Sequence, residues 1–210
     1  MMRRAISILT AALCLSIPSP AAAAVSERMV TETWERISAA AELPPSPAHF
    51  EDKKEPNAWI AFGPDKQELH VTRGLMSLLR SEDEIAGILA HEAGHIRLGH
   101  YKSTVGRSIA WTLLATLLKG DRVGETIAGV GIGLAESGFS REQEVAADDF
   151  GVRLSAAAGY SPWGLFRAME RMKNAGVTTS PNGFNSHPPT ERRLLHLREF
   201  TTAVERERKK

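Results

Sequence analysis

The chain has 210 residues, of which 42% are hydrophobic and 24% are charged, and its formal net charge is +1. This near-neutral balance argues against nucleic acid or an anionic membrane surface as the main partner. The single cysteine, Cys14, excludes a fold held by intramolecular disulfides, so a hydrophobic core has to stabilise the chain.

Residues 1–24 have the pattern of a secretory signal peptide. Two arginines precede an apolar run, residues 5–17, which is too short to span a bilayer, and small residues follow up to Ala24. Cleavage is expected at or just before Ala24 and would remove the cysteine. The sequence therefore predicts an exported, periplasmic protein with one domain over residues 25–210.

The first part of this domain alternates between helical and extended patterns. Residues 26–43 repeat apolar side chains at helical spacing and end at a proline-rich stretch. Residues 57–62 and 68–72 resemble short strands joined by a turn-rich link, residues 63–67, so a hairpin is expected. A short helix over residues 74–79 should follow it.

The next helix carries the most informative motif of the chain. Ser81 and Glu84 have the spacing of a capping box, in which the serine hydroxyl accepts from a backbone amide and the glutamate accepts from the serine amide. His91 and His95 then share one helix face, because residues four apart do so. With Glu92 beside them, they form the smallest pattern of a zinc hydrolase. The alternative is a chance match in an ordinary amphipathic helix.

Further helices are expected in the second half of the chain. Two apolar segments are too short to cross a bilayer, and buried or site-covering helices are favoured for them over membrane contact. Ser140 and Gln143 form a second capping box. The expected segments are apolar helices over residues 109–118 and 127–134, helices over 140–158 and 161–174, a loop over 176–185 and a last helix from about residue 189.

A third protein ligand is needed, because zinc hydrolases of this geometry use three ligands and leave one position for water. Glu144 is the candidate, since Asp148 lies four residues later on the same face. In this arrangement Asp148 accepts the free ring N–H of a ligating histidine, most plausibly His91. The alternative is that these acids only decorate an exposed helix, but Ala146 and Ala147 favour a packed face.

Three blocks stand in the order and spacing of a known family. They are His91 to His95, Ser140 to Asp148, and Ser186 to Arg193, within a region from Asn57 to Arg193. They resemble the CAAX prenyl endopeptidase family of zinc metalloproteases, which also contains the HtpX-type bacterial proteases and soluble periplasmic members of the BepA type.

This resemblance implies a gluzincin-like α+β fold, mainly α, with a small sheet beside the zinc-bearing helix. It implies one zinc ion on His91, His95 and Glu144, with Glu92 as general base. It also places His187 and Arg193 near the open zinc position as oxyanion donors. Asn57 and Ala58 would lie on the edge strand that binds an extended peptide.

Two features depart from the family pattern, and one residue has several interpretations. The link at residues 63–67 differs from the family's short Gly-Gly turn, and the sequence ends soon after Arg193, so no helical-repeat domain is expected. His187 could instead fill the fourth zinc position and keep the enzyme latent, or be only a turn residue. The remaining histidines lack partners at ligand spacing and are expected to be structural or exposed: His49, His70, His100 and His196.

The predicted function is an exported zinc endopeptidase that cleaves unfolded or misassembled envelope proteins. Its expected partner is a polypeptide substrate, with membrane contact not required. Two rivals stay open at this point. One is a non-catalytic, zinc-stabilised binding or chaperone-like module, against which Glu92 argues, because structural zinc needs no general base. The other is a membrane-anchored protease with an uncleaved leader.

Overall fold

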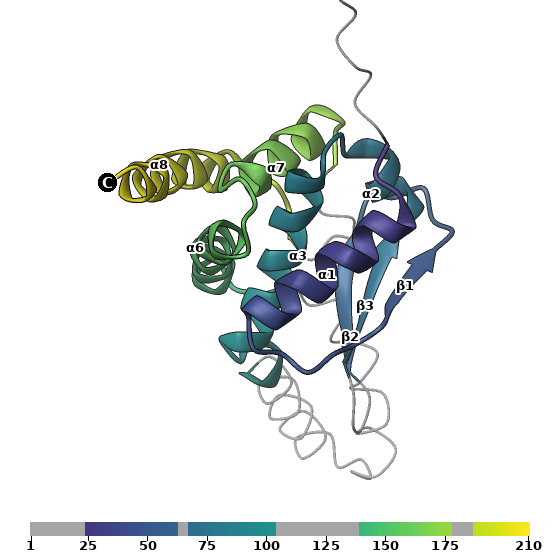
Figure 1. The fold of residues 1–210 in the computed structure, drawn as a ribbon. Helices are drawn as coiled ribbons and strands as arrows, with labels where there is room; N and C mark the ends of the chain where they lie inside the picture. The colour runs from purple at the N-terminus through teal and green to yellow at the C-terminus, as the bar shows by residue number, and fades with distance from the viewer. Residues whose placement is uncertain (1–23, 63–66, 104–138, 178–186) are drawn as a thin grey trace, which may run out of the picture.

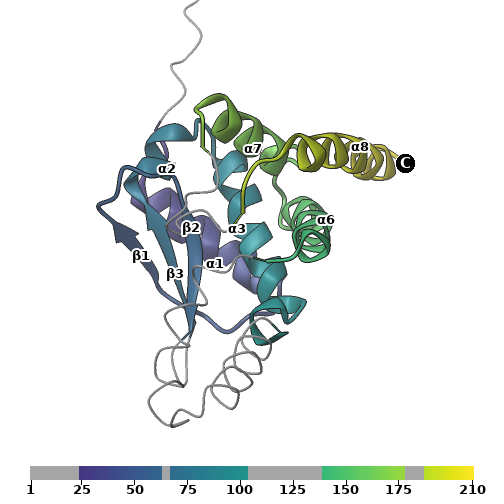
Figure 2. The ribbon, with the colours of Figure 1, turned by 180° about the vertical axis from the view of Figure 1, so that it is seen from behind.

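The computed structural model describes residues 24–62, 67–103, 139–177 and 187–210. Within this part, α3 lies between a three-stranded sheet on one side and α6 on the other (Figures 1 and 2). The mainly helical architecture with a small sheet confirms the predicted α+β class. The elements are α1 Glu27–Ala40, β1 Ala48–Glu51, β2 Ala58–Phe62, β3 Gln67–Thr72, α2 Arg73–Leu78, α3 Glu82–Arg97, α6 Arg141–Ala157, α7 Gly164–Asn174 and α8 Glu191–Arg208.

Several predicted segments lie outside the described residues. They are the signal peptide up to residue 23, the link at 63–66, the apolar segments within 104–138 and most of the predicted loop, 178–186. The expectations for these segments therefore stay predictions.

The sheet has the strand order β1-β3-β2. β2 and β3 pair antiparallel, with Ala58 opposite Val71, which confirms the predicted hairpin. β1 pairs parallel to β3, with Ala48 opposite Leu69, and the sequence did not predict it. Four residues directly after a proline-rich stretch are too few to show a strand period, so this pairing depends on tertiary contacts.

α3 is the central element of the fold, and every residue from Glu84 to His95 is buried. The Ser81 hydroxyl accepts from the Glu84 amide at 3.2 Å, as a helix cap should. The other predicted hydrogen bond of the capping box, from the Ser81 amide to the Glu84 carboxylate, is wrong. The Glu84 carboxylate instead accepts from the Arg80 amide at 2.6 Å and from the Arg171 side chain at 2.8 Å. A buried carboxylate needs a charged partner, and α7 supplies one here.

Small residues let α6 approach α3 closely behind the histidine motif. A Cβ at Gly151 would lie 2.9 Å from the His91 backbone nitrogen, and a Cβ at Gly94 would lie 3.1 Å from the Ala147 carbonyl oxygen. Gly94 lowers helix propensity by about 1 kcal/mol relative to alanine, so close packing accounts for its place in the motif. The second capping box, between Ser140 and Gln143, is complete and starts α6 as predicted.

The two C-terminal helices complete the packing around α3 and α6. α7 begins at Gly164, slightly later than predicted, and its cap residue Trp163 makes no side-chain cap hydrogen bond. α8 begins after Thr190, whose hydroxyl accepts from the Arg193 amide at 3.3 Å. α8 packs on α6 and α7, and so carries Arg193 towards the histidine motif.

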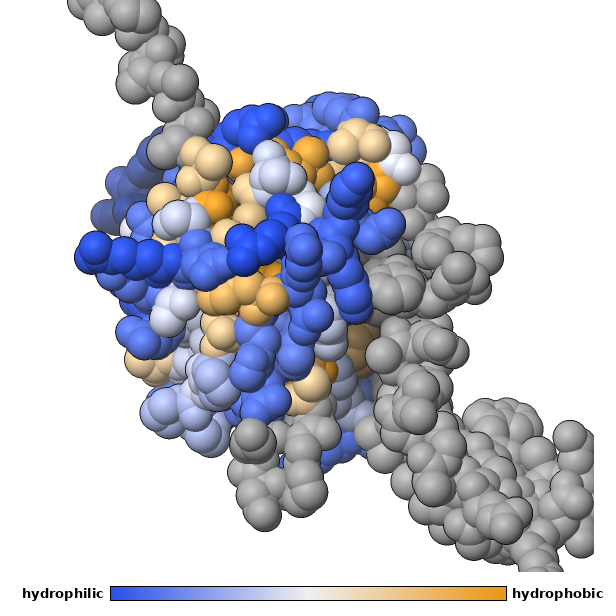
Figure 3. Space-filling model, turned by 90° about the vertical axis from the view of Figure 1, so that its right-hand side faces the viewer, coloured by the Kyte–Doolittle hydropathy of each residue, from blue (hydrophilic) through white to orange (hydrophobic). Residues whose placement is uncertain are grey.

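Figure 3 shows the face on the sheet side of the molecule, where polar side chains surround smaller apolar patches. Among the described helices, none combines the length and apolar character that crossing a bilayer requires.

Candidate metal centre

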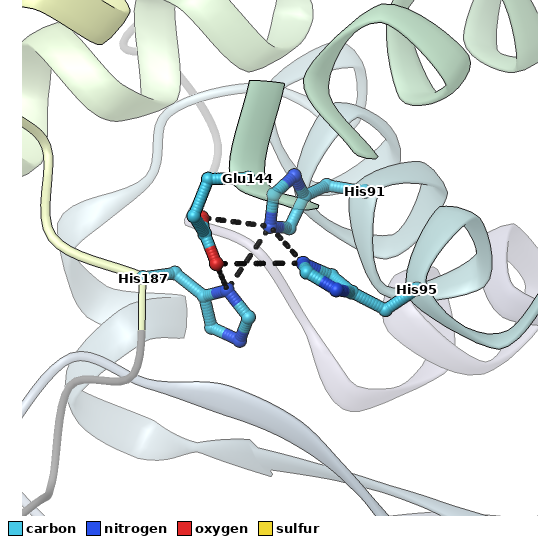
Figure 4. A group of neighbouring side chains, drawn as sticks. All are labelled: His91, His95, Glu144 and His187. Atoms are coloured by element: carbon cyan, nitrogen blue, oxygen red, sulfur yellow. Dashed lines mark hydrogen bonds and ion pairs between the residues drawn. The ribbon is translucent and has the colours of Figure 1, made fainter. Parts of the chain in front are cut away.

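The helical spacing of α3 brings the side chains of His91, Glu92 and His95 together on a buried face. The three residues are only 2%, 2% and 0% exposed. The Nε2 atoms of His91 and His95 lie 3.1 Å apart (Figure 4). Burial lowers the pKa of His95, and the neighbouring His91 lowers it further, so its ring is neutral, the form that binds a metal.

Two further donors reach the same point from other elements. Glu144 on α6 lies with its Oε2 atom 3.6 Å from His91 Nε2 and its Oε1 atom 3.6 Å from His95 Nε2. His187, three residues before the cap of α8, lies with Nδ1 3.1 Å from His91 Nε2 and 2.8 Å from Glu144 Oε1 (Figure 4). All four donor atoms are within 4.8 Å of one another.

This arrangement fits a zinc ion. Zinc binds nitrogen ligands at about 2.0–2.1 Å in a tetrahedron, so two ligand atoms lie about 3.3 Å apart. The separations of 3.1 Å between His91 and His95, and of 3.6 Å from each to Glu144, bracket this value. Two imidazole nitrogens that face each other beside a carboxylate need a shared cation or proton between them.

Asp148 lies behind the first histidine. Its Oδ1 atom is 3.0 Å from His91 Nδ1, on the side of the ring opposite the donor cluster, and the carboxylate is fully buried. The sequence predicted that Asp148 accepts the ring N–H of His91, and this role stays a prediction. The contact would fix His91 with Nδ1 protonated and Nε2 free to bind the metal.

Arg193 joins the two carboxylates of α6 to α8. Its Nε and Nη2 atoms donate to the two oxygens of Asp148 at 2.9 and 2.7 Å, and its Nη1 atom lies 2.7 Å from Glu144 Oε2. Burial raises the pKa of Asp148, but Arg193 and His91 outweigh this and lower it to about 2. The guanidinium therefore compensates two buried negative charges, while its predicted role as an oxyanion donor stays a prediction.

Three neighbours of the site were not recognised in the sequence. His100, which was expected to be structural or exposed, lies with Nδ1 3.0 Å from His95 Nδ1 and so touches the site. The Tyr101 hydroxyl donates to Glu92 Oε2 at 3.1 Å. The Phe139 ring stacks on the His95 ring, with 3.9 Å between the ring centroids. The only local signal was Gly99, whose φ of 69° ends α3 and turns the chain back towards the site.

Asn57 and Ala58 lie at the start of β2, beside the same site. Both line a small cavity that also contacts catalytic candidates from α3 and the loop before α8. The lining residues are Asn57, Ala58, Leu75, Ile88, His91, Glu92, Met169, Met172 and His187. The structure thus places the predicted peptide-binding strand next to the predicted base.

A histidine pair and a glutamate from two packed helices form the donor pattern that is typical of zinc hydrolases of the gluzincin type. Comparison with known proteins agrees, because the family model "Peptidase family M48" matches residues 24–201. The chain belongs to peptidase family M48, whose metal is zinc. This confirms the predicted resemblance and cofactor.

The relatives include three bacterial proteases. Metalloprotease LoiP of Escherichia coli K12 is 29% identical over 64% of this chain and 56% of its own length. Metalloprotease YcaL of the same strain is 30% identical over 62% of this chain and 54% of its own length. The HtpX homolog of Salinibacter ruber is 29% identical over 79% of this chain and 72% of its own. The match therefore spans little more than half of LoiP and YcaL.

Proposed function

We propose that the protein is an exported zinc endopeptidase that cleaves unfolded or misassembled envelope proteins. The observation that carries the proposal is the buried Glu92 carboxylate, whose Oε1 atom lies 3.6 Å from His187 Nε2 at the edge of the donor cluster. A metal that only stabilises the fold needs ligands but no such base. Family membership supports peptide-bond hydrolysis as the reaction.

His91, His95 and Glu144 would hold the ion, which when bound lowers the pKa of its water and polarises the scissile carbonyl. In the proposed mechanism Glu92 takes the proton from the attacking water and returns it to the leaving amine. Asp148 keeps His91 in one tautomer during these steps. Arg193 is the nearby donor for the oxyanion, once a substrate has rearranged its present contacts.

The substrate would bind as an added strand on β2. Among the described residues β2 is an edge strand, because it pairs with β3 alone there, and Ala58 lies on it beside Glu92 in the cavity lining. Main-chain pairing at a sheet edge requires an extended segment and depends little on side-chain identity. Unfolded polypeptides supply such segments, which supports a role in quality control.

Export is proposed from residues 1–24. Val25, the first residue after the expected cleavage site, is 5% exposed and belongs to the core. Cleavage there would leave the described domain intact. A mature N-terminus at Val25 in a soluble periplasmic extract is the expected result, whereas an intact leader in the membrane fraction would favour the anchored alternative.

Removal of zinc should abolish cleavage of an unfolded protein such as casein by residues 25–210. The measurement is the cleavage rate before chelation, after chelation and after one equivalent of zinc is returned. Activity should fall to background and recover with zinc. Cleavage that survives verified loss of the metal would contradict the proposed function.

We also propose that His187 keeps the enzyme latent. Its Nδ1 atom lies within the donor cluster, 2.8 Å from Glu144 Oε1, where it occupies the side from which a substrate carbonyl would approach. His187→Ala should therefore raise the basal rate of casein cleavage severalfold, while His196→Ala, a change at a half-buried histidine that pairs with Asp149, should leave it unchanged. A loss of activity in His187→Ala with zinc retained would instead indicate the oxyanion role.

A further inference from the structure

Tyr101 contacts the predicted general base although no motif includes it. After α3 ends, Gly99 adopts a φ of 69°, and residues 100–103 begin another helical turn that points back towards the site. The Tyr101 hydroxyl donates to Glu92 Oε2 at 3.1 Å. This is a hydrogen bond to a charged group, which is stronger than one between neutral groups.

The hydrogen bond distinguishes the two oxygens of the Glu92 carboxylate. Oε2 is held by the tyrosine, while Oε1 lies 3.6 Å from His187 Nε2, on the side of the donor cluster. A carboxylate held through one oxygen cannot rotate freely about its terminal bond. The tyrosine therefore keeps the other oxygen turned towards the place where the attacking water would lie.

The same hydroxyl lies beside the sheet. Burial raises the pKa of Tyr101 most and Glu92 raises it further, while the nearby backbone amide of Ile60 on β2 acts to lower it. The strand register explains why this amide is available to the hydroxyl. Thr72 N donates to Asn57 O across the hairpin, and bonded pairs alternate along an antiparallel ladder. Ala58 and Ile60 thus direct their backbone groups to the open edge of β2.

We propose that Tyr101 is a positioning residue that orients Glu92 beside the edge strand on which the substrate lies. The hydroxyl donates to the Glu92 carboxylate and lies beside the Ile60 amide, so it sets the base relative to a peptide paired at Ala58. The inference rests on the proposed peptidase function. It adds a specific role in the reaction for a residue outside the zinc-binding motif.

The test is Tyr101→Phe, which removes the hydroxyl and keeps the ring. Loss of a hydrogen bond to a charged group should lower kcat for a fluorogenic peptide on the order of ten- to a hundredfold. The KM, the zinc content and the melting temperature should stay close to those of the wild type. A role that is only structural would lower the melting temperature or the zinc content along with kcat.

The matched control is Tyr160→Phe at the other tyrosine of the chain. Its hydroxyl also donates to a glutamate, Glu82 Oε1, at 3.1 Å, but this pair lies at the start of α3, away from the donor cluster. Tyr160→Phe should leave kcat unchanged. A wild-type kcat in Tyr101→Phe, or a fall that follows zinc loss, would overturn the inference while the peptidase function stands. Absence of cleavage by the wild type would overturn both.

Discussion

Replacing Glu144 by glutamine is expected to weaken zinc binding by more than about a hundredfold and to abolish peptide cleavage. Substitution of residues that only support ligands costs about 10–100-fold in affinity, and a direct ligand should cost more. A neutral amide is a poor zinc ligand. It would also leave the Arg193 guanidinium, 2.7 Å from Glu144 Oε2, with one compensating carboxylate fewer. The measurement is zinc affinity by competition with a chelating dye.

Glu142 offers the matched control for this prediction. It lies two residues earlier in the same sequence block, but its side chain is exposed on α6. Glu142→Gln should bind zinc and cleave like the wild type. Equal zinc affinity in Glu144→Gln and Glu142→Gln would show that the third ligand lies elsewhere.

Asp148→Asn is expected to lower the free energy of unfolding by about 3 kcal/mol, because removing one partner leaves a buried charge uncompensated. The affected charge is Arg193, which binds both oxygens of Asp148. The pKa of Asp148, about 2, lies below the ordinary aspartate value, so its carboxylate contributes fully to the free energy of unfolding above about pH 4. This contribution is lost as the pH falls towards 2. Urea unfolding of the wild type and the variant at pH 7 measures the difference.

The neighbouring Asp149 separates this effect from a general loss of charge on α6. Asp149 pairs with His196 at 2.6 Å, and both side chains are about one-third exposed, at 34% and 33%. Asp149→Asn should cost less than about 1 kcal/mol, as exposed ion pairs do. Similar losses of unfolding free energy in the two variants would contradict the stabilising role of the buried ion pair between Asp148 on α6 and Arg193 on α8.

The helix motif and the hairpin could be predicted because local spacing determines them. His91 and His95 share a face in any α-helix, and strand residues on either side of a turn pair with each other. Asp148 was proposed in the same way, four residues after Glu144 on one face, and the two side chains lie at the same cluster. The sequence thus contained most of the donor set before any tertiary contact was known.

What could not be predicted depends on how distant segments meet. β1 is too short to show a period, and its partner β3 lies about twenty residues later in the register that pairs Ala48 with Leu69. Tyr101 reaches Glu92 only because α3 ends at Arg97 and the chain turns at Gly99. The bidentate contact of Arg193 with Asp148 requires α8 to pack on α6. No spacing rule connects these residues.

The central claim, that Glu92 is the base of a zinc peptidase, is tested most directly by casein cleavage with residues 25–210 and the Glu92→Gln variant, with zinc measured in both. The account predicts about one zinc per chain in both proteins. It also predicts cleavage that is at least about a hundredfold slower in the variant. Equal cleavage by two zinc-loaded proteins would contradict the role of Glu92, and no cleavage by a zinc-loaded wild type would contradict the peptidase function.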